Sequence, residues 1–245
     1  MQNKEKLKIL VIGDIHQTNN YKRFNFSEYN KIIFLGDYFD DHNSNGEKLN
    51  PITNFLEILS LQKQNPQKYI VLLGNHDFQY LDLNEHYSGK QIHKQYDIHE
   101  FLEEHLKEFR LVYQLDNILF SHAGVSSIWC EDYQLKDIET INSLLWNKIY
   151  GALCFYPYDT SWTGRNSHQS CIWIRPEALC MYPWGNYTQI VGHTSNLGPN
   201  GVMRVKMKND KSLFVVDNKE HTAYLELEIN KDIETECNIP FEIPM

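Results

Sequence analysis

Five short apolar runs in this 245-residue chain are followed by side chains that can bind metal ions, directly after a glycine in four of them and after Ser121 in the fifth. The residues in these positions are Asp14 and His16, Asp37, Asn75 and His76, His122, and His193. Carboxylate, imidazole and amide groups without thiolates suit Mn, Fe or Zn and argue against a closed structural zinc site. Asp37, in the middle of the series, is the natural bridge between two ions. A pair of ions about 3.5 to 4 Å apart activates a hydroxide and holds the oxygens of a phosphoryl group. The residue types thus indicate phosphate-ester chemistry.

Each motif taken alone has an ordinary structural explanation. An Asp that follows a strand usually caps a helix or closes a turn, and a lone His is usually a structural or surface residue. We give that second interpretation to the remaining histidines, which are His42, His86, His93, His99, His105, His168 and His221. The five strand-end motifs, taken together and in this order, favour a common site instead.

The apolar pattern also predicts the elements that must position these residues. Residues 7–12, 31–35 and 69–73 are continuous runs rich in Ile, Val and Leu, which is typical of strands covered on both faces. Between the last two runs, apolar residues recur at helical spacing, with Asn50 as N-cap and Pro51 in the first turn. Because ligand sites lie beyond the carboxyl ends of strands in open α/β sheets, we expect the motifs to converge.

The rest of the chain predicts two more helices followed by mainly β-structure. The helices are expected within 97–109 and 137–149, and hairpins are expected at Asp116–Asn117 and Asn209–Asp210. Residues 154–184 are aromatic and poorly periodic, as in long loops. Because there is no repeat, low-complexity segment or Gly/Ser/Pro-rich linker, we predict a single domain over residues 1–245.

Composition narrows the function classes. With 42% hydrophobic and 22% charged residues the chain reads as an ordinary globular protein, and a net charge of -9 makes nucleic acid an unlikely partner. The first residues have no apolar stretch long enough for a signal or a membrane span, so we expect no membrane partner and a cytoplasmic protein. Five widely spaced cysteines without a C-x-x-C pair are expected to be reduced.

The ordered motifs GDIH, GDYFD, GNHD, SHAG and GHT resemble the signature of the calcineurin-like metallophosphoesterases, and SLLWN resembles a stretch of their phosphoprotein phosphatase branch. The resemblance spans residues 13 to about 194. It implies an α/β fold in which two mixed β-sheets pack as a sandwich flanked by helices. It also implies an enzyme with two divalent metal ions that hydrolyses phosphate esters by attack of a hydroxide between the ions, without a covalent intermediate.

The same resemblance implies residue roles. The first ion is expected on Asp14, His16 and Asp37, and the second on Asp37, Asn75, His122 and His193. His76 is expected to be the general acid that protonates the leaving oxygen, oriented by Asp40. Asp77 is expected to hold the loop.

The chain departs from the family pattern at two places. Many members end the last motif with Gly-His-x-His, whereas this chain has Ser195 at the final position, which leaves the first ion with three protein ligands. The phosphoprotein phosphatases and the bacterial symmetrical dinucleoside tetraphosphatases also lack that second His, so the departure points to their branch. That branch usually carries Asp-Arg-Gly in its second motif, but Asp41 and His42 stand here. Arg165 is the first candidate for the missing phosphate-binding arginine and Arg175 the second.

The expected substrates are a phosphoprotein, a dinucleoside polyphosphate or a small phosphoester. Two alternatives stay open: a metallo-nuclease or cyclic phosphodiesterase on the same fold, and a binding module without catalysis. The aromatic residues near the motifs could line a groove, although core packing is the better interpretation for the first three; they are Tyr38, Phe39, Trp146, Trp162 and Trp184.

Overall fold

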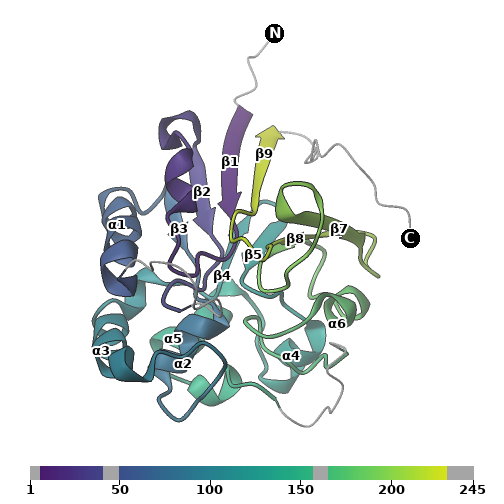
Figure 1. The fold of residues 1–245 in the computed structure, drawn as a ribbon. Coiled ribbons are helices and arrows are strands. Elements are labelled where there is room, and N and C mark those ends of the chain that lie inside the picture. Colours follow the sequence, from purple (N-terminus) through teal and green to yellow (C-terminus); the bar gives the residue numbers. More distant parts are fainter. Residues whose placement is uncertain (1–5, 41–49, 157–164, 231–245) are drawn as a thin grey trace.

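The computed structural model describes residues 6–40, 50–156 and 165–230, and Asp41, His42, Trp162 and Cys237 lie outside these ranges. The first sheet has the strand order β3-β2-β1-β9. Its strands are β1 (Lys6–Ile12), β2 (Lys31–Phe34), β3 (Tyr69–Val71) and β9 (Tyr224–Asn230). The first three are parallel, and β9 runs antiparallel to β1 along its whole length, as the purple and yellow arrows of Figure 1 show.

The second sheet has the strand order β4-β5-β6-β8-β7. Its strands are β4 (Val112–Leu115), β5 (Ile118–Ser121), β6 (Thr188–Val191), β7 (Val202–Lys206) and β8 (Ser212–Val216). The β5, β6 and β8 strands are parallel, while β4 and β7 form antiparallel hairpins at the two edges. Both predicted hairpins are thus confirmed, and so is the prediction of two mixed sheets.

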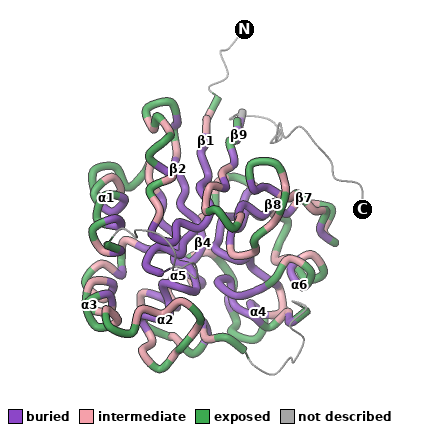
Figure 2. Tube along the Cα trace, in the orientation of Figure 1, coloured by how far each residue is buried: buried purple, intermediate pink, exposed green. Residues whose placement is uncertain are grey.

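The two sheets share one apolar layer. Because side chains alternate along a strand, Ile9 and Val11 of β1 face that layer, together with Phe120 of β5 and Phe214 of β8. Leu10 of β1 belongs to the larger cluster on the opposite face of the first sheet. Buried residues therefore fill the centre of the molecule, while exposed residues lie along the outer helices and loops, as Figure 2 shows.

Helices cover the outer faces of both sheets (Figure 1). The α-helices are α1 (Pro51–Gln64), α2 (Asn75–Leu81), α3 (Gln95–Glu104), α4 (Ser127–Asp132), α5 (Ile138–Trp146) and α6 (Pro176–Met181). Short 3-10 turns are η1 (Asn20–Arg23), η2 (Phe26–Glu28), η3 (Ile92–Lys94), η4 (Leu106–Glu108), η5 (Tyr150–Ala152) and η6 (Pro199–Gly201). Within the described ranges, none of these helices combines the length and the apolar character needed to cross a bilayer.

Local signals explain where the predicted helices begin and end. The Asn50 side chain accepts a hydrogen bond from the Thr53 N–H at 3.1 Å, a cap that stabilises a helix by about 1 kcal/mol. Asp137 and Thr140 form a reciprocal capping box at the start of α5. The helix predicted within 97–109 is shorter than expected, because α3 ends at Glu104 and the chain continues as the separate turn η4. Leu106 is nevertheless buried, so the apolar residues of this segment pack on the core from two short elements, α3 and η4.

Candidate metal centre

The candidate ligands follow the ends of strands at one edge of the sandwich. Asp14 follows β1, Asp37 follows β2, and Asn75 opens α2 just beyond β3. His122 follows β5 and His193 follows β6. Since β1, β2 and β3 are parallel in one sheet, and β5 and β6 are parallel in the other, their carboxyl ends bring these residues together. Ligand atoms of Asp14, Asp37 and His122 all lie within 4.8 Å of one another.

Asp37 lies between two histidines. Its Oδ2 atom is 3.6 Å from Nε2 of His16 and 3.4 Å from Nε2 of His122. Oδ1 of Asn75 lies 2.8 Å from the same nitrogen of His122. Asp14 completes the arrangement, with Oδ2 4.0 Å from Nε2 of His16 and Oδ1 3.9 Å from Nδ1 of His122. Asp37 thus has the position required of a carboxylate that bridges two ions.

The tautomers of the two histidines follow from their second nitrogens. Nδ1 of His16 donates to the backbone carbonyl of Asp40 at 2.7 Å, and Nδ1 of His122 donates to that of Leu35 at 2.9 Å, because a carbonyl only accepts. Burial lowers the pKa of His122 to about 3, so its ring is neutral and Nε2 carries a lone pair. In the neutral ring, the Nε2 atom of each histidine therefore carries the lone pair, on the side of the Asp37 carboxylate. Groups that only accept hydrogen bonds need a cation between them, which fits a metal site.

His193, the last of the candidate ligands, lies next to His122 and Asp14. Its ring centroid lies 5.0 Å from that of His122, and its backbone N–H donates to both carboxylate oxygens of Asp14 at 3.1 Å. Its Nε2 atom is buried, and among the described residues it has no hydrogen-bond partner. Burial and, after it, the positive charge of Arg175 hold the pKa of His193 well below its usual value. A buried, neutral imidazole with an unused lone pair fits a metal ligand.

The backbone at the centre shows one close approach that requires glycine and three strained conformations. A Cβ atom built on Gly192 would lie 2.2 Å from Oδ1 of Asp14, so the glycine of the last motif leaves room for that carboxylate. His16, Asp37 and His193 have left-handed backbone conformations, with φ of 42°, 57° and 64°. Non-glycine residues rarely adopt this conformation, and such strain gathers at functional sites.

Without metal ions, the surroundings of the buried carboxylates at this centre disfavour their ionised forms. The pKa values of Asp14 and Asp37 are raised well above the usual range, first by burial and next by like charges, from Asp217 and Asp14 respectively. Bound cations reverse the effect, because they stabilise the ionised carboxylates. The donor set, its burial and its charge therefore fit divalent ions at Asp14, His16, Asp37, Asn75, His122 and His193.

His76 lies beside this centre with a carboxylate behind it. Its Nδ1 atom is 2.6 Å from Oδ1 of Asp40, and its backbone N–H donates to Oδ1 of Asp37 at 2.9 Å. The side chain of Gln79 donates to the other carboxylate oxygen of Asp40. The structure thus brings together the two residues that the sequence analysis paired.

Asp77 holds the loops of two motifs together. Its carboxylate accepts hydrogen bonds from the backbone N–H groups of Gly74 and Asp37 at 2.9 Å and of Tyr38 at 2.6 Å. Burial raises the pKa of Asp77 to about 7, although these backbone hydrogen bonds act in the opposite direction. The prediction that Asp77 holds the loop is confirmed.

The two candidate arginines have different surroundings. Arg165 is 70% exposed and pairs with Glu177 of α6, with Nε 2.7 Å from Oε1. Arg175, at the start of α6, donates from Nη1 to the carbonyl of His193 at 3.0 Å and to Oγ1 of Thr194 at 3.1 Å. Arg175 is exposed as well; partial desolvation by the surrounding protein lowers its pKa, while the charges of Asp14 and Asp37 raise it. Arg175 therefore contacts the loop of a candidate metal ligand, whereas Arg165 contacts α6. The sequence predicts the opposite order of the two candidates.

Two residues near the centre were not selected from the sequence. Asp217 directly follows the apolar run of β8, and its charge acts on Asp14. The same pattern of an apolar strand followed by Asp marks Asp14, so a signal for Asp217 was present. His221 was assigned a structural role, yet its ring centroid lies 4.4 Å from that of His16. No local pattern indicated this contact.

Core packing is confirmed for Tyr38 and Phe39, which are fully buried. Trp146 packs on the core and donates to the carbonyl of Phe109 at 3.0 Å, in agreement with the same interpretation. Trp184 is partly buried and stacks on Tyr187.

Comparison with known proteins agrees with this geometry. The family described as calcineurin-like phosphoesterase matches residues 7–194. The solved structure of a protein serine/threonine phosphatase from Saccharomyces cerevisiae, with similarity to human phosphatase PP5, has a TM-score of 0.51 at 17% identity, covering 86% of this chain and 67% of that chain. A metallophosphoesterase from Sphaerobacter thermophilus has a TM-score of 0.41 at 11% identity, covering 91% and 84%. Among curated protein sequences, none matches significantly. The predicted resemblance and fold class are both confirmed.

Proposed function

The chain belongs to the calcineurin-like phosphoesterase family, and on that premise we propose that it is a phosphatase of the phosphoprotein phosphatase and dinucleoside tetraphosphatase type. Members of the family are hydrolases that depend on two divalent metal ions, as the sequence predicted. The choice among Mn, Fe and Zn stays a prediction. So does the substrate, which is a phosphoprotein, a dinucleoside polyphosphate or a small phosphoester.

One observation carries the proposal of catalysis. The His76 and Asp40 pair, at 2.6 Å, is attached to the metal centre through the hydrogen bond from the His76 backbone to Asp37. An aspartate behind a histidine fixes the orientation of the ring and stabilises the charge it carries when doubly protonated. A binding module without catalysis would have no need of this pair. Nε2 of His76 would then donate a proton to the oxygen of the leaving group.

The remaining roles follow from position. Asp14, His16 and Asp37 would hold the first ion, and Asp37, Asn75, His122 and His193 the second. The ions, when bound, supply Lewis acidity and an activated water at neutral pH. Arg175 would bind oxygens of the substrate phosphate, because a guanidinium pairs with phosphate in a bidentate manner. Arg165 remains a weaker candidate for the same role, since Glu177 already pairs with it.

We also propose that the enzyme prefers phosphate monoesters to diesters. This proposal rests on Ser195, which stands where the nuclease-type members of the superfamily carry a second histidine. The test is hydrolysis of p-nitrophenyl phosphate and bis-p-nitrophenyl phosphate after chelation and addition of Mn, Fe, Zn or Mg. We expect activity on the monoester with added metal and none before addition. Activity on the diester alone would favour a nuclease or cyclic phosphodiesterase, and inactivity with both ions bound would favour a binding module.

A further inference from the structure

The loop between β8 and β9 lies against the half of the metal centre formed by Asp14 and His16. Gly13 contacts both ends of this loop: its N–H donates to the carbonyl of Ala223 at 3.1 Å, and a Cβ built on it would lie 2.3 Å from the carbonyl oxygen of Val216. The residues that follow Gly13 and Val216 are Asp14 and Asp217. The loop is therefore attached beside the first candidate ligand.

Within this loop, His221 packs on a candidate ligand of the first ion. Its ring centroid lies 4.4 Å from that of His16, at an interplanar angle of 49°. Two imidazoles bound to one ion at about 2.1 Å, roughly at right angles, have centroids separated by roughly 4.5 Å. The observed separation is thus compatible with a shared ion.

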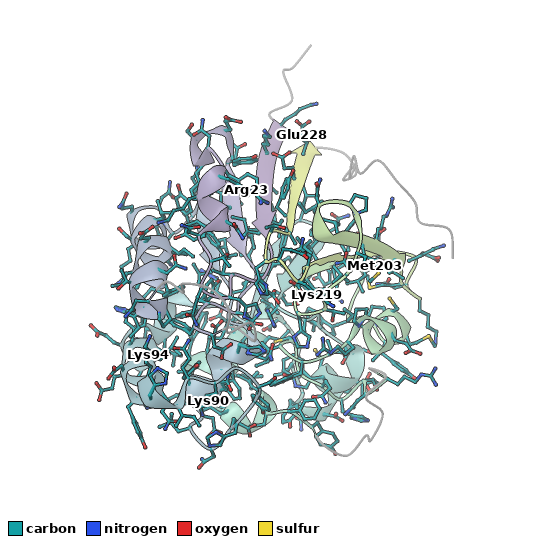
Figure 3. The ribbon with its side chains drawn as sticks, in the orientation of Figure 1. Arg23, Lys90, Lys94, Met203, Lys219 and Glu228 are labelled. Atoms are coloured by element: carbon teal, nitrogen blue, oxygen red, sulfur yellow. The ribbon has the colours of Figure 1, made fainter. Side chains whose placement is uncertain are left out.

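The position of His221 is built into the loop. Its backbone has φ of 51°, the left-handed conformation also found at His16 and Asp37. Its N–H donates to the carbonyl of Asn218 at 3.0 Å, and its own carbonyl accepts from the side chain of Asn20 in η1 at 3.0 Å. Figure 3 marks this loop by Lys219 and η1 by Arg23, whose guanidinium donates to the carbonyl of Thr222.

Asp217 adds negative charge at the same place. It is 5% exposed, and its Oδ1 atom has no hydrogen-bond partner among the described residues. A buried carboxylate oxygen without a donor is costly unless a cation or a bound water satisfies it. The loop thus brings one carboxylate beside Asp14 and one imidazole beside His16, and both of these ligands belong to the first ion.

We infer that His221 is a further protein ligand of the first metal ion and takes the place of the imidazole that the last motif lacks at Ser195. The inference rests on the proposed function, since it assumes the two-ion centre. It assigns to this chain four protein ligands for the first ion, from β1, β2 and the β8–β9 loop. Asp217 lies outside this ligand set, and its charge acts on Asp14.

The test measures, by calorimetry, how Mn binds to the 245-residue chain after a chelator has removed its metal. The metal content after desalting is measured as well. We compare His221→Phe, which keeps a ring against His16, with His168→Phe at an exposed histidine paired with Asp132. The wild type and His168→Phe should bind two Mn. His221→Phe should bind one ion as the wild type does and the other at least 10-fold more weakly. His16→Ala should weaken that same ion, while His193→Ala should weaken the other.

Equal binding of both ions by His221→Phe and the wild type would overturn the inference, and so would weakening of the ion that depends on His193. The melting temperature of the metal-free variant shows whether it folds, and His221→Gln replaces it if it does not. The proposed function fails separately, if wild-type protein with two ions bound hydrolyses neither nitrophenyl ester.

Discussion

Gly74 and Asp37 are in direct contact, because a Cβ atom built on Gly74 would lie 2.0 Å from Oδ1 of Asp37. We predict that Gly74→Ala displaces the bridging carboxylate. Forcing extra volume into a packed site costs about 1 to 3 kcal/mol, so the melting temperature should fall and Mn affinity should drop at least 10-fold. Gly151→Ala is the control, because a Cβ there meets no atom within 4 Å. Equal Mn affinity for both variants would contradict the prediction.

The His76 and Asp40 pair predicts a separation of turnover from metal content. His76→Gln and Asp40→Asn should lower kcat by about 10² to 10⁴, the usual contribution of general acid catalysis, while two ions stay bound. The loss should be smaller for p-nitrophenyl phosphate than for an alkyl phosphate, because nitrophenolate leaves without protonation. Rate and metal content are measured on the same samples. Metal loss that matches the rate loss would remove His76 from the role of acid.

The contacts of Arg175 predict its part in phosphate recognition. Arg175→Lys keeps the charge but loses the planar fork, so KM and the inhibition constant for inorganic phosphate should rise roughly 10-fold or more, as for a loss of about 1.5 kcal/mol or more. Arg165→Ala is the matched control and should change neither constant. The opposite pattern, with Arg165→Ala impaired and Arg175→Lys normal, would restore Arg165 as the first candidate. Metal content of each variant should equal that of the wild type.

Metal stabilisation should depend on pH. The pKa values of Asp14 and Asp37 are raised in the metal-free folded state, so this state holds protons that the unfolded chain releases near pH 4. Its stability from these groups therefore falls as pH rises above about 4. His122 is neutral across this range, because burial lowers its pKa to about 3, so protons compete with metal at the carboxylates.

The resulting prediction concerns the rise in melting temperature that saturating Mn produces. This rise should be larger at pH 7.5 than at pH 5, since metal binding requires ionised carboxylates. Differential scanning calorimetry with and without chelator measures it at both pH values. A rise that does not change with pH would mean that Asp14 and Asp37 do not hold protons in the metal-free chain. Mg or buffer ions are excluded by dialysis against chelator beforehand.

Local patterns in the sequence were sufficient to predict part of the centre. An apolar strand followed by a ligand is a local signal, and it located Asp14 and Asp37, each directly after a glycine, and His122, directly after Ser121, at strand ends. Parallel strands then bring their carboxyl ends to one edge, whatever the details of packing. Asn50 as a helix cap and the two hairpin turns are local in the same sense. For these features the residues that interact are close in sequence or belong to a regular sheet.

The other contacts of the centre depend on how distant segments pack together. β9 could have joined either sheet, and its antiparallel pairing with β1 places the β8–β9 loop, with Asp217 and His221, beside Asp14 and His16. The choice between Arg165 and Arg175 likewise depends on where the start of α6 packs against the loop of His193. These contacts join segments far apart in the chain, and their energies come from packing and burial that no local pattern encodes. That is why His168 lies on the surface, paired with Asp132, whereas His221 packs against His16.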